Sequence, residues 1–262
     1  MKVKREKVIS INSLRGGTGK SLIAINLAFL FAKKGLNVSI LDLDFRAPTL
    51  YTLFEGELQE YTTNDFLNNK CSIEDVLVDV SGKYKLKGRL FVGLADPSLE
   101  AIHDMINKDS KWEMRALQRL LSLKSTIRSL GLDYIIYDTS PGILYSSINA
   151  AASSDIPILV STVDNADIAG TRRMIKEIYS ALEKKVFVLL NKFVSREPLS
   201  ESGWNVIIRR FENTLKSQVI GIIPCFCDVL EVGYQYIFAL NRPEHPFVKN
   251  LEAVAERINT IK

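Results

Sequence analysis

The sequence is poor in the residues that form disulfides and many metal sites. It has three cysteines and two histidines among 262 residues. Cys225 and Cys227 are separated by one residue instead of the two that are typical of metal and redox pairs, so with Cys71 they predict no disulfide framework. His103 and His245 are isolated along the chain, and we expect them on a helix surface and in a helix-entry turn.

Long apolar runs are also missing. The longest, Leu22–Ala32, is interrupted by Asn26 and is too short to span a bilayer. The charged start, Met1–Lys7, lacks the apolar segment of a signal peptide. We therefore expect a cytoplasmic protein. The net charge of +4 is spread along the chain, so it does not by itself favour nucleic acid or an anionic membrane.

The chain shows neither an internal repeat nor a linker rich in Pro, Gly and Ser. Apolar strand-like runs alternate with helical patterns, which predicts the α/β class: one domain over residues 1–262, with a single doubly wound, mostly parallel sheet flanked by helices. The predicted strands are 8–11, 38–43, 90–95, 134–137, 156–161, 186–190 and 219–223. The predicted helices are 20–34, 47–54, 63–69, 72–78, 98–107, 111–130, 146–153, 166–182, 201–216 and 248–261.

A glycine-rich segment follows the first predicted strand and reads RGGTGKS over residues 15–21. Glycines let backbone N–H groups surround an anion, and the N-terminus of the following helix adds unpaired N–H groups. Lys20 would reach the β- and γ-phosphates, and the Ser21 hydroxyl would bind Mg²⁺. The strict phosphate-loop motif, G-x-x-x-x-G-K-[ST], has glycine where this chain has Leu14. The predicted phosphate-binding residues are Gly16, Gly17, Thr18, Gly19, Lys20 and Ser21.

Aspartates end two further strands, and ligands of open parallel sheets bind at the carboxyl ends of strands. Asp138 fits the aspartate that holds Mg²⁺, usually through a water. Asp44 is placed to orient or deprotonate a water that attacks the phosphate, and we expect it near the metal. The predicted metal-binding residues are therefore Ser21, Asp44 and Asp138. Asp42 lies two residues before Asp44 and so shares its face. It could face the same site, hold waters of Mg²⁺, or hold the loop itself.

These motifs resemble those of the ParA/MinD family of deviant-Walker P-loop ATPases. The matching stretches are RGGTGKS, LDLDFRAP at 41–48 and YDTSPG at 137–142, and the similarity extends over nearly the whole chain. The resemblance implies ATP and Mg²⁺ as cofactors and hydrolysis of ATP to ADP and phosphate, slow without a stimulating partner protein. It also implies that Asn191 hydrogen-bonds the adenine and that Pro224 lines the base pocket.

One position departs from the family pattern. The family's signature lysine, which reaches across a dimer to the partner's nucleotide, would fall at Arg15. A guanidinium also suits phosphate oxygens. The resemblance therefore implies an ATP-dependent homodimer, with Arg15, Lys20 and Asp44 as the catalytic residues.

The expected function is a nucleotide-driven dimerisation switch that partitions or positions DNA or a large complex. Nonspecific DNA is a candidate partner, through basic residues such as Arg209 and Arg210. Membrane attachment through the last helix is not expected, because its charge is balanced and it looks like a core-packing helix.

Two other functions stay open. Residues 42–48 also resemble the second motif of bacterial tyrosine kinases, although the chain has no tyrosine after Tyr236. An iron–sulfur or metal carrier would need paired cysteines with the usual spacing, which Cys225 and Cys227 do not have.

Overall fold

The computed structural model describes residues 6–54, 60–195, 200–233 and 236–261; most of the charged start, residues 1–5, lies outside these ranges. The strands are β1 (Lys7–Asn12), β2 (Val38–Leu43), β3 (Val78–Asp79), β4 (Leu90–Gly93), β5 (Tyr134–Thr139), β6 (Ile156–Ser161), β7 (Phe187–Phe193) and β8 (Gln218–Pro224). The helices are α1 (Lys20–Lys33), α2 (Leu50–Phe54), α3 (Thr63–Leu67), α4 (Leu99–Ile106), α5 (Ser110–Ser129), α6 (Tyr145–Ser153), α7 (Asn165–Met174), α8 (Glu201–Leu215), α9 (Cys227–Val232), α10 (Phe238–Asn241) and α11 (Pro246–Thr260), and the π-helical turn η2 (Ile175–Tyr179) continues α7.

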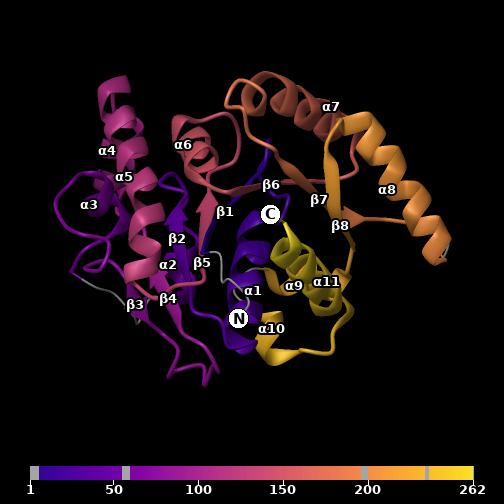
Figure 1. The fold of residues 1–262 in the computed structure, drawn as a ribbon, viewed down its shortest axis with the longest axis horizontal. Coiled ribbons are helices and arrows are strands. Elements are labelled where there is room, and N and C mark those ends of the chain that lie inside the picture. The colour runs from indigo at the N-terminus through magenta and orange to yellow at the C-terminus, as the bar shows by residue number, and fades with distance from the viewer. Residues whose placement is uncertain (1–5, 55–59, 196–199, 234–235, 262) are drawn as a thin grey trace.

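The strands form one sheet in the order β3-β4-β2-β5-β1-β6-β7-β8 (Figure 1). Among the described residues, every strand pairing is parallel except that of β3 with β4. Strands β2 to β5 lie on one side of β1, and β6, β7 and β8 lie on its other side. The strand order therefore reverses next to β1. The prediction of a single, mostly parallel sheet flanked by helices is confirmed.

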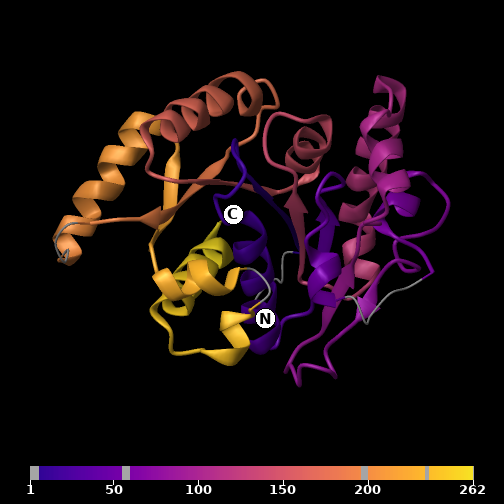
Figure 2. The same cartoon turned by 180° about the vertical axis from the view of Figure 1, so that it is seen from behind.

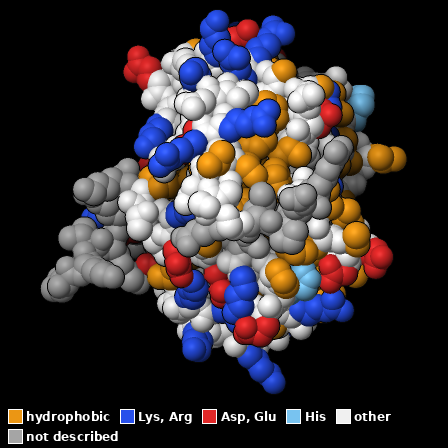
Figure 3. All heavy atoms as spheres, turned by 90° about the vertical axis from the view of Figure 1, so that its right-hand side faces the viewer, with side chains coloured by type: hydrophobic (Ala, Val, Ile, Leu, Met, Phe, Trp, Pro, Cys, Tyr) orange, Lys and Arg blue, Asp and Glu red, His pale blue; other side chains and the backbone are white. Residues whose placement is uncertain are grey.

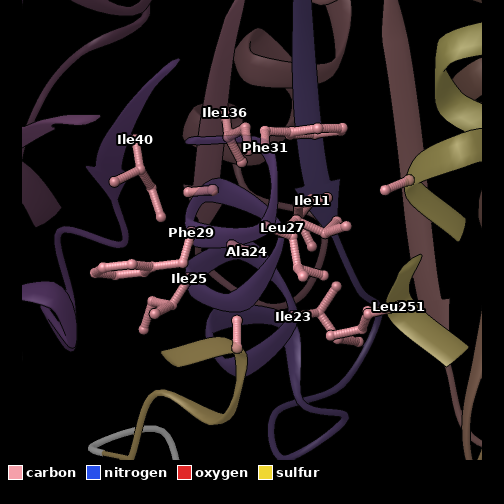
Figure 4. Close-up of a cluster of buried hydrophobic side chains, with 14 of the residues drawn as sticks. Ile11, Ile23, Ala24, Ile25, Leu27, Phe29, Phe31, Ile40, Ile136 and Leu251 are labelled. Carbon is pink, nitrogen blue, oxygen red and sulfur yellow. The ribbon is translucent and has the colours of Figure 1, made fainter. Parts of the chain in front are cut away.

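Helices cover both faces of the sheet (Figures 1 and 2). Alternate strand residues face opposite sides. Ile9 and Ile136 face a core built with α1, α10 and α11, whereas Val8 and Ile135 face a core built with α3, α5 and α6. Helix α1 is apolar around its whole circumference, as is expected for a helix enclosed between a sheet and a second helical layer. Figure 4 shows its side chains together with Ile11 of β1, Ile40 of β2, Ile136 of β5 and Leu251 of α11.

The predicted helix at 72–78 is wrong. Ser72 N and Oγ both donate to Asp75 Oδ2, at 2.8 and 2.7 Å, which closes a short turn. The chain then enters β3, where Val78 pairs with Val92 of β4. Burial of Ile73 and Val76 and this edge pairing outweigh the local helical pattern.

Two other predictions need adjustment. The helix predicted at 166–182 is α-helical only to Met174 and then widens into η2. The segment 225–247, to which the sequence pattern assigned no element of its own, contains α9 and α10. Within the described part of the chain, no helix is both long and apolar enough to cross a membrane.

Candidate functional site

Three hydrogen bonds from two other segments hold the phosphate loop between β1 and α1. Gly142 N donates to Ser13 O at 2.8 Å, Asn191 Nδ2 donates to Thr18 O at 2.8 Å, and Lys192 Nζ donates to Gly17 O at 2.7 Å. The donors come from the segment after β5 and from the end of β7. The loop is therefore fixed by the protein itself.

Glycine is required at two positions of this loop. Gly17 and Gly19 have φ values of 75° and 95°, in the left-handed region that favours glycine. A Cβ on Gly19 would also lie 2.5 Å from Asn191 Nδ2. The close contact of the loop with β7 thus depends on Gly19 having no side chain.

Asp42 holds the turn that carries Asp44. It is fully buried, and its two carboxylate oxygens accept from Asp44 N at 2.9 Å and Leu50 N at 3.1 Å. Among the described residues, the hydrogen bonds of the Asp42 carboxylate go to the turn after β2 and not to the phosphate loop. Asp44 in turn accepts a 2.7 Å hydrogen bond from Ser140 Oγ, so the end of β5 positions the carboxylate that follows β2.

Asp138 lies at the centre of the site. It is fully buried and accepts from Thr49 Oγ1 at 3.3 Å, and the Ser21 hydroxyl lies close enough to lower its pKa. Lys20, also buried, interacts electrostatically with both Asp138 and Asp44. The structure therefore brings together the four predicted residues Lys20, Ser21, Asp44 and Asp138.

The site contains more buried negative charge than Lys20 can balance. Burial raises the pKa of Asp138 to about 6, against the opposing effects of the Ser21 hydroxyl and the Lys20 charge. Burial, followed by the charge of Asp138, raises the pKa of Asp42 well above its usual value. Burial lowers the pKa of Lys20, which the two carboxylates oppose. A further cation would relieve this repulsion.

Two buried polar atoms at the site have no hydrogen-bond partner among the described residues: Asp138 Oδ1 and Thr18 Oγ1. Buried polar atoms in proteins are nearly always hydrogen-bonded, and an absent ligand, ion or water is one cause of an exception. Oxygen donors of this kind suit Mg²⁺ and its waters, and a hydroxyl beside a glycine-rich loop suits a phosphate oxygen. The residues present therefore fit a magnesium–triphosphate group.

The remaining predicted residues lie on the phosphate loop and at the carboxyl ends of β7 and β8. Gly16 and Arg15 are exposed, and Arg15 Nη1 lies 3.4 Å from Asp164 Oδ1 at the start of α7. Asn191 is buried with its amide against the phosphate loop. Pro224 ends β8 and lies opposite Phe193 of β7 in the sheet.

One contact could not be found from the sequence pattern. Leu14 stands where the strict motif has glycine, and its Cδ2 occupies the space that a Cβ on Gly170 would need. The side chain of Leu14 thus packs on α7 at Gly170, which has no side chain of its own. No local signal marks Gly170, because the two residues meet only in the folded chain.

A mostly parallel sheet with a glycine-rich loop before α1, and aspartates at the carboxyl ends of β2 and β5, defines the P-loop NTPase fold. A family model described as "CobQ/CobB/MinD/ParA nucleotide binding domain" matches residues 9–232. The chain therefore belongs to this family, and within it resembles MinD and ParA proteins.

Relatives of known sequence include site-determining proteins. The septum site-determining protein MinD of Thermotoga maritima is 28% identical over 254 residues, covering 96% of this chain and 87% of the relative. The flagellum site-determining protein YlxH of Helicobacter pylori is 28% identical over 185 residues, covering 71% of this chain and 58% of the relative.

Solved structures show the same fold. The cell division ATPase MinD of Pyrococcus furiosus superposes with a TM-score of 0.75 at 19% identity, covering 98% of this chain and 99% of that chain. A plasmid partition protein of Borrelia burgdorferi bound to AMPPNP gives 0.75 at 20% identity, covering 98% and 100%. MinD of Pyrococcus horikoshii with Mg-ADP gives 0.74 at 18% identity, covering 97% and 96%.

Proposed function

We propose that this chain is a magnesium-dependent ATPase that hydrolyses ATP to ADP and phosphate and acts as a nucleotide-driven dimerisation switch. The observation that carries the proposal is the convergence of Lys20, Ser21, Asp44 and Asp138 at one edge of the sheet, with Asp138 Oδ1 and Thr18 Oγ1 left without partners among the described residues. We also propose that residues 1–262 act as one nucleotide-binding unit, since β1 and β8 share one sheet and α11 packs on α1.

The proposed chemistry assigns each side chain one task. Bound Mg²⁺ would neutralise charge that develops on the phosphate oxygens. Lys20 would bind those oxygens, and Ser21 and Asp138 would hold the metal and its waters. Asp44 uses Oδ1 to accept from Ser140 Oγ and, at 3.3 Å, from Ala47 N, so we assign its Oδ2 to orient the attacking water.

The base would lie near the ends of β7 and β8. In the proposal, Asn191 hydrogen-bonds adenine and Pro224 lines the pocket. This assignment is supported by position alone: Asn191 contacts the phosphate loop through Thr18, and Pro224 ends the neighbouring strand. The Asn191 amide would then connect the base to the loop that holds the phosphates.

Arg15 is the residue we assign to the dimer. Its side chain is 54% exposed, and its pairing with Asp164 at 3.4 Å is between two exposed groups. Exposed ion pairs of this kind contribute about 0–1 kcal/mol, so Arg15 is easily released to contact the phosphates of a partner protomer.

Sedimentation of Arg15→Ala with Mg²⁺ and AMPPNP, a non-hydrolysable ATP analogue, tests this assignment. The parent should dimerise and the variant should remain monomeric, while Arg172→Ala, an exposed arginine of α7, should behave as the parent. Equal dimerisation of Arg15→Ala and the parent would rule out the role in trans. The proposal also predicts that basal hydrolysis is slow, which steady-state phosphate release measures.

The names of the relatives and neighbours indicate the use of the switch: septum and flagellum site determination, and plasmid partition. We infer that the chain partitions or positions DNA or a large complex with the help of a stimulating partner protein. A solved neighbour from Aquifex aeolicus is a complex of MinC and MinD, which supports a protein partner. These names favour the switch over a tyrosine kinase or a metal carrier.

Nonspecific DNA remains a proposed cargo. Arg209, Arg210 and Lys216 are exposed on and just after α8. Figure 3 shows, on the side of the molecule that carries α8, Lys and Arg side chains scattered around an apolar centre. Retardation of random-sequence DNA that requires ATP, fails with ADP and weakens with salt would support this cargo. Absence of retardation with ATP, with ADP and at every salt concentration would exclude nonspecific DNA as the cargo.

The last helix is not available to bind a bilayer. The apolar side chains of α11 are buried against α1 and the sheet, whereas membrane attachment needs an apolar face that is free to enter the lipid. This supports the expectation that the switch does not reach a membrane through α11. The buried apolar residues of α11 are Phe247, Val248, Leu251, Val254, Ala255 and Ile258.

A further inference from the structure

The segment between β2 and α2 connects two neighbouring strands of the site. Asp42 of β2 and Asp138 of β5 lie opposite each other in the sheet. Leu50 N donates to Asp42 Oδ2 at 3.1 Å, and Thr49 Oγ1 donates to Asp138 Oδ2 at 3.3 Å. Two adjacent residues of one segment thus bind the carboxylates of two neighbouring strands.

Of these two contacts, only that of Thr49 needs a particular side chain. Every residue except proline has a backbone N–H, so the bond from Leu50 to Asp42 does not depend on the leucine side chain. The bond to Asp138 depends on the hydroxyl, since a valine at position 49 would fill the same space without donating. No sequence pattern marks Thr49, which directly follows the motif at 41–48.

The Thr49 hydroxyl is not used to cap α2. Thr49 directly precedes this helix, at a place where threonine side chains often accept from a backbone N–H of the first turn. Among the described residues, no N–H donates to Thr49 Oγ1, and the hydrogen bond of this hydroxyl goes to Asp138. The loss of the hydroxyl should therefore act on the site and not on α2 alone.

The two carboxylate oxygens of Asp138 differ in their surroundings. Asp138 is fully buried and Thr49 is half-buried. Oδ2 accepts from Thr49, whereas Oδ1 is buried without a hydrogen-bond partner in the described part of the chain. A carboxylate rotates in a broad energy well about the bond that carries it, so a donor that holds one oxygen also restricts the other. Thr49 thus restricts the direction of the oxygen that is left for a ligand.

The other groups near Asp138 have tasks of their own in the proposed site. The Ser21 hydroxyl lies close to Asp138, but it is assigned to the metal. Lys20 acts on Asp138 through its charge and is assigned to the phosphates. The hydroxyl of Thr49 can therefore orient the carboxylate without itself binding the nucleotide or the metal.

We propose that Thr49 is a positioning residue of the nucleotide site, whose hydroxyl holds Asp138 so that Oδ1 stays available to the metal and its waters. This inference rests on the proposed magnesium-dependent ATPase and adds a residue that acts on the metal through Asp138. Loss of the hydroxyl weakens the contribution of Mg²⁺ to ATP binding and leaves the contacts between the phosphates and the loop intact. A hydrogen bond to a charged group is worth about tenfold or more in an equilibrium constant.

Isothermal titration of Thr49→Val with ATP tests the proposal, because valine has the branched shape of threonine but no hydroxyl. In Mg²⁺, the dissociation constant for ATP should rise about tenfold above that of the parent. In EDTA, where binding is weaker, variant and parent should have the same dissociation constant. Thr49→Ser keeps the hydroxyl and should bind as the parent does in both conditions.

Thr126→Val is the matched control. Thr126 is half-buried on α5, and its hydroxyl donates within its own helix, to Ser122 O at 3.1 Å. This variant should bind ATP as the parent does, with and without Mg²⁺. Thr49→Ala is a second variant without the hydroxyl and should show the same loss as Thr49→Val, so the result does not depend on the folding of one protein, which circular dichroism checks.

A Thr49→Val protein that binds ATP in Mg²⁺ as tightly as the parent would overturn the inference and leave the proposed ATPase intact. An equal loss in Mg²⁺ and in EDTA, or an equal loss in Thr49→Ser, would also overturn it, because both indicate a general disturbance of the segment. A parent protein that takes up no ATP in Mg²⁺ would overturn the proposed function, and this inference with it.

Discussion

Replacing Asp138 by Asn is expected to make the nucleotide-free protein more stable. The pKa of Asp138 rises from 3.8 to about 6, chiefly through burial. Each pKa unit corresponds to about 1.4 kcal/mol, so the buried negative charge costs the fold about 3 kcal/mol at neutral pH. Asparagine keeps the shape and removes the charge. The free energy of unfolding at pH 7.5 without Mg²⁺ should therefore rise by up to about 3 kcal/mol.

The pH dependence follows from the same shift. Because the folded protein binds the Asp138 proton more tightly than the unfolded chain, the cost is present above pH 6 and disappears as the pH falls from about 6 towards 4. Urea unfolding at pH 7.5 and pH 5 should thus show a smaller difference between variant and parent at pH 5. Asp164→Asn, at an exposed carboxylate that caps α7, should change stability little, since Asn caps equally well.

The substitution should also remove the response to magnesium and ATP. Saturating Mg²⁺ and ATP should raise the unfolding midpoint of the parent but not that of Asp138→Asn, because ligand binding stabilises only the state that binds. A variant that is less stable than the parent at pH 7.5 without Mg²⁺ would refute the reasoning. A variant that keeps the full stabilisation by magnesium and ATP would refute the metal assignment.

Three further substitutions probe the contacts that position the site. Gly170→Ala should destabilise the parent by about 1 kcal/mol through overlap with Leu14 Cδ2, but should stabilise a Leu14→Ala protein by up to about 1 kcal/mol. Urea unfolding of the parent, the two single variants and the double variant measures both effects, and a change of the same sign in both backgrounds contradicts the contact. Ser140→Ala should lower kcat about tenfold or more and leave KM nearly unchanged, because its hydroxyl holds Asp44; an unchanged kcat in steady-state assays would refute this role. His245→Ala should cost about 1 kcal/mol of stability, since the ring caps α11; His245→Asn should restore most of it, and equal loss in both variants would speak against capping.

The features that could be predicted from the sequence are local. Each of three features has a sequence pattern that spans only a few residues. They are the glycines with left-handed φ, the helix that begins with Lys20, and the aspartates at the ends of apolar strands. Parallel topology places those strand ends at one edge. The convergence of Lys20, Ser21, Asp44 and Asp138 follows from these two facts together.

The features that could not be predicted depend on contacts distant in sequence. Residues 72–78 have a helical pattern, but pairing of β3 with β4 decides their structure. Packing of Leu14 against Gly170, and the hydrogen bond from Ser140 to Asp44, join segments that share no periodicity. The excess of buried carboxylate charge likewise appears only once burial is known, since composition gives a protein of mildly positive charge.

Isothermal titration of the nucleotide-free protein with ATP tests the central claim most directly. The account predicts binding at one site per chain that requires Mg²⁺, weakens strongly in EDTA and is lost in Lys20→Ala, whose fold can be checked by circular dichroism. A folded parent protein that takes up no ATP in the presence of Mg²⁺, or that binds it equally well without the metal, would contradict the account.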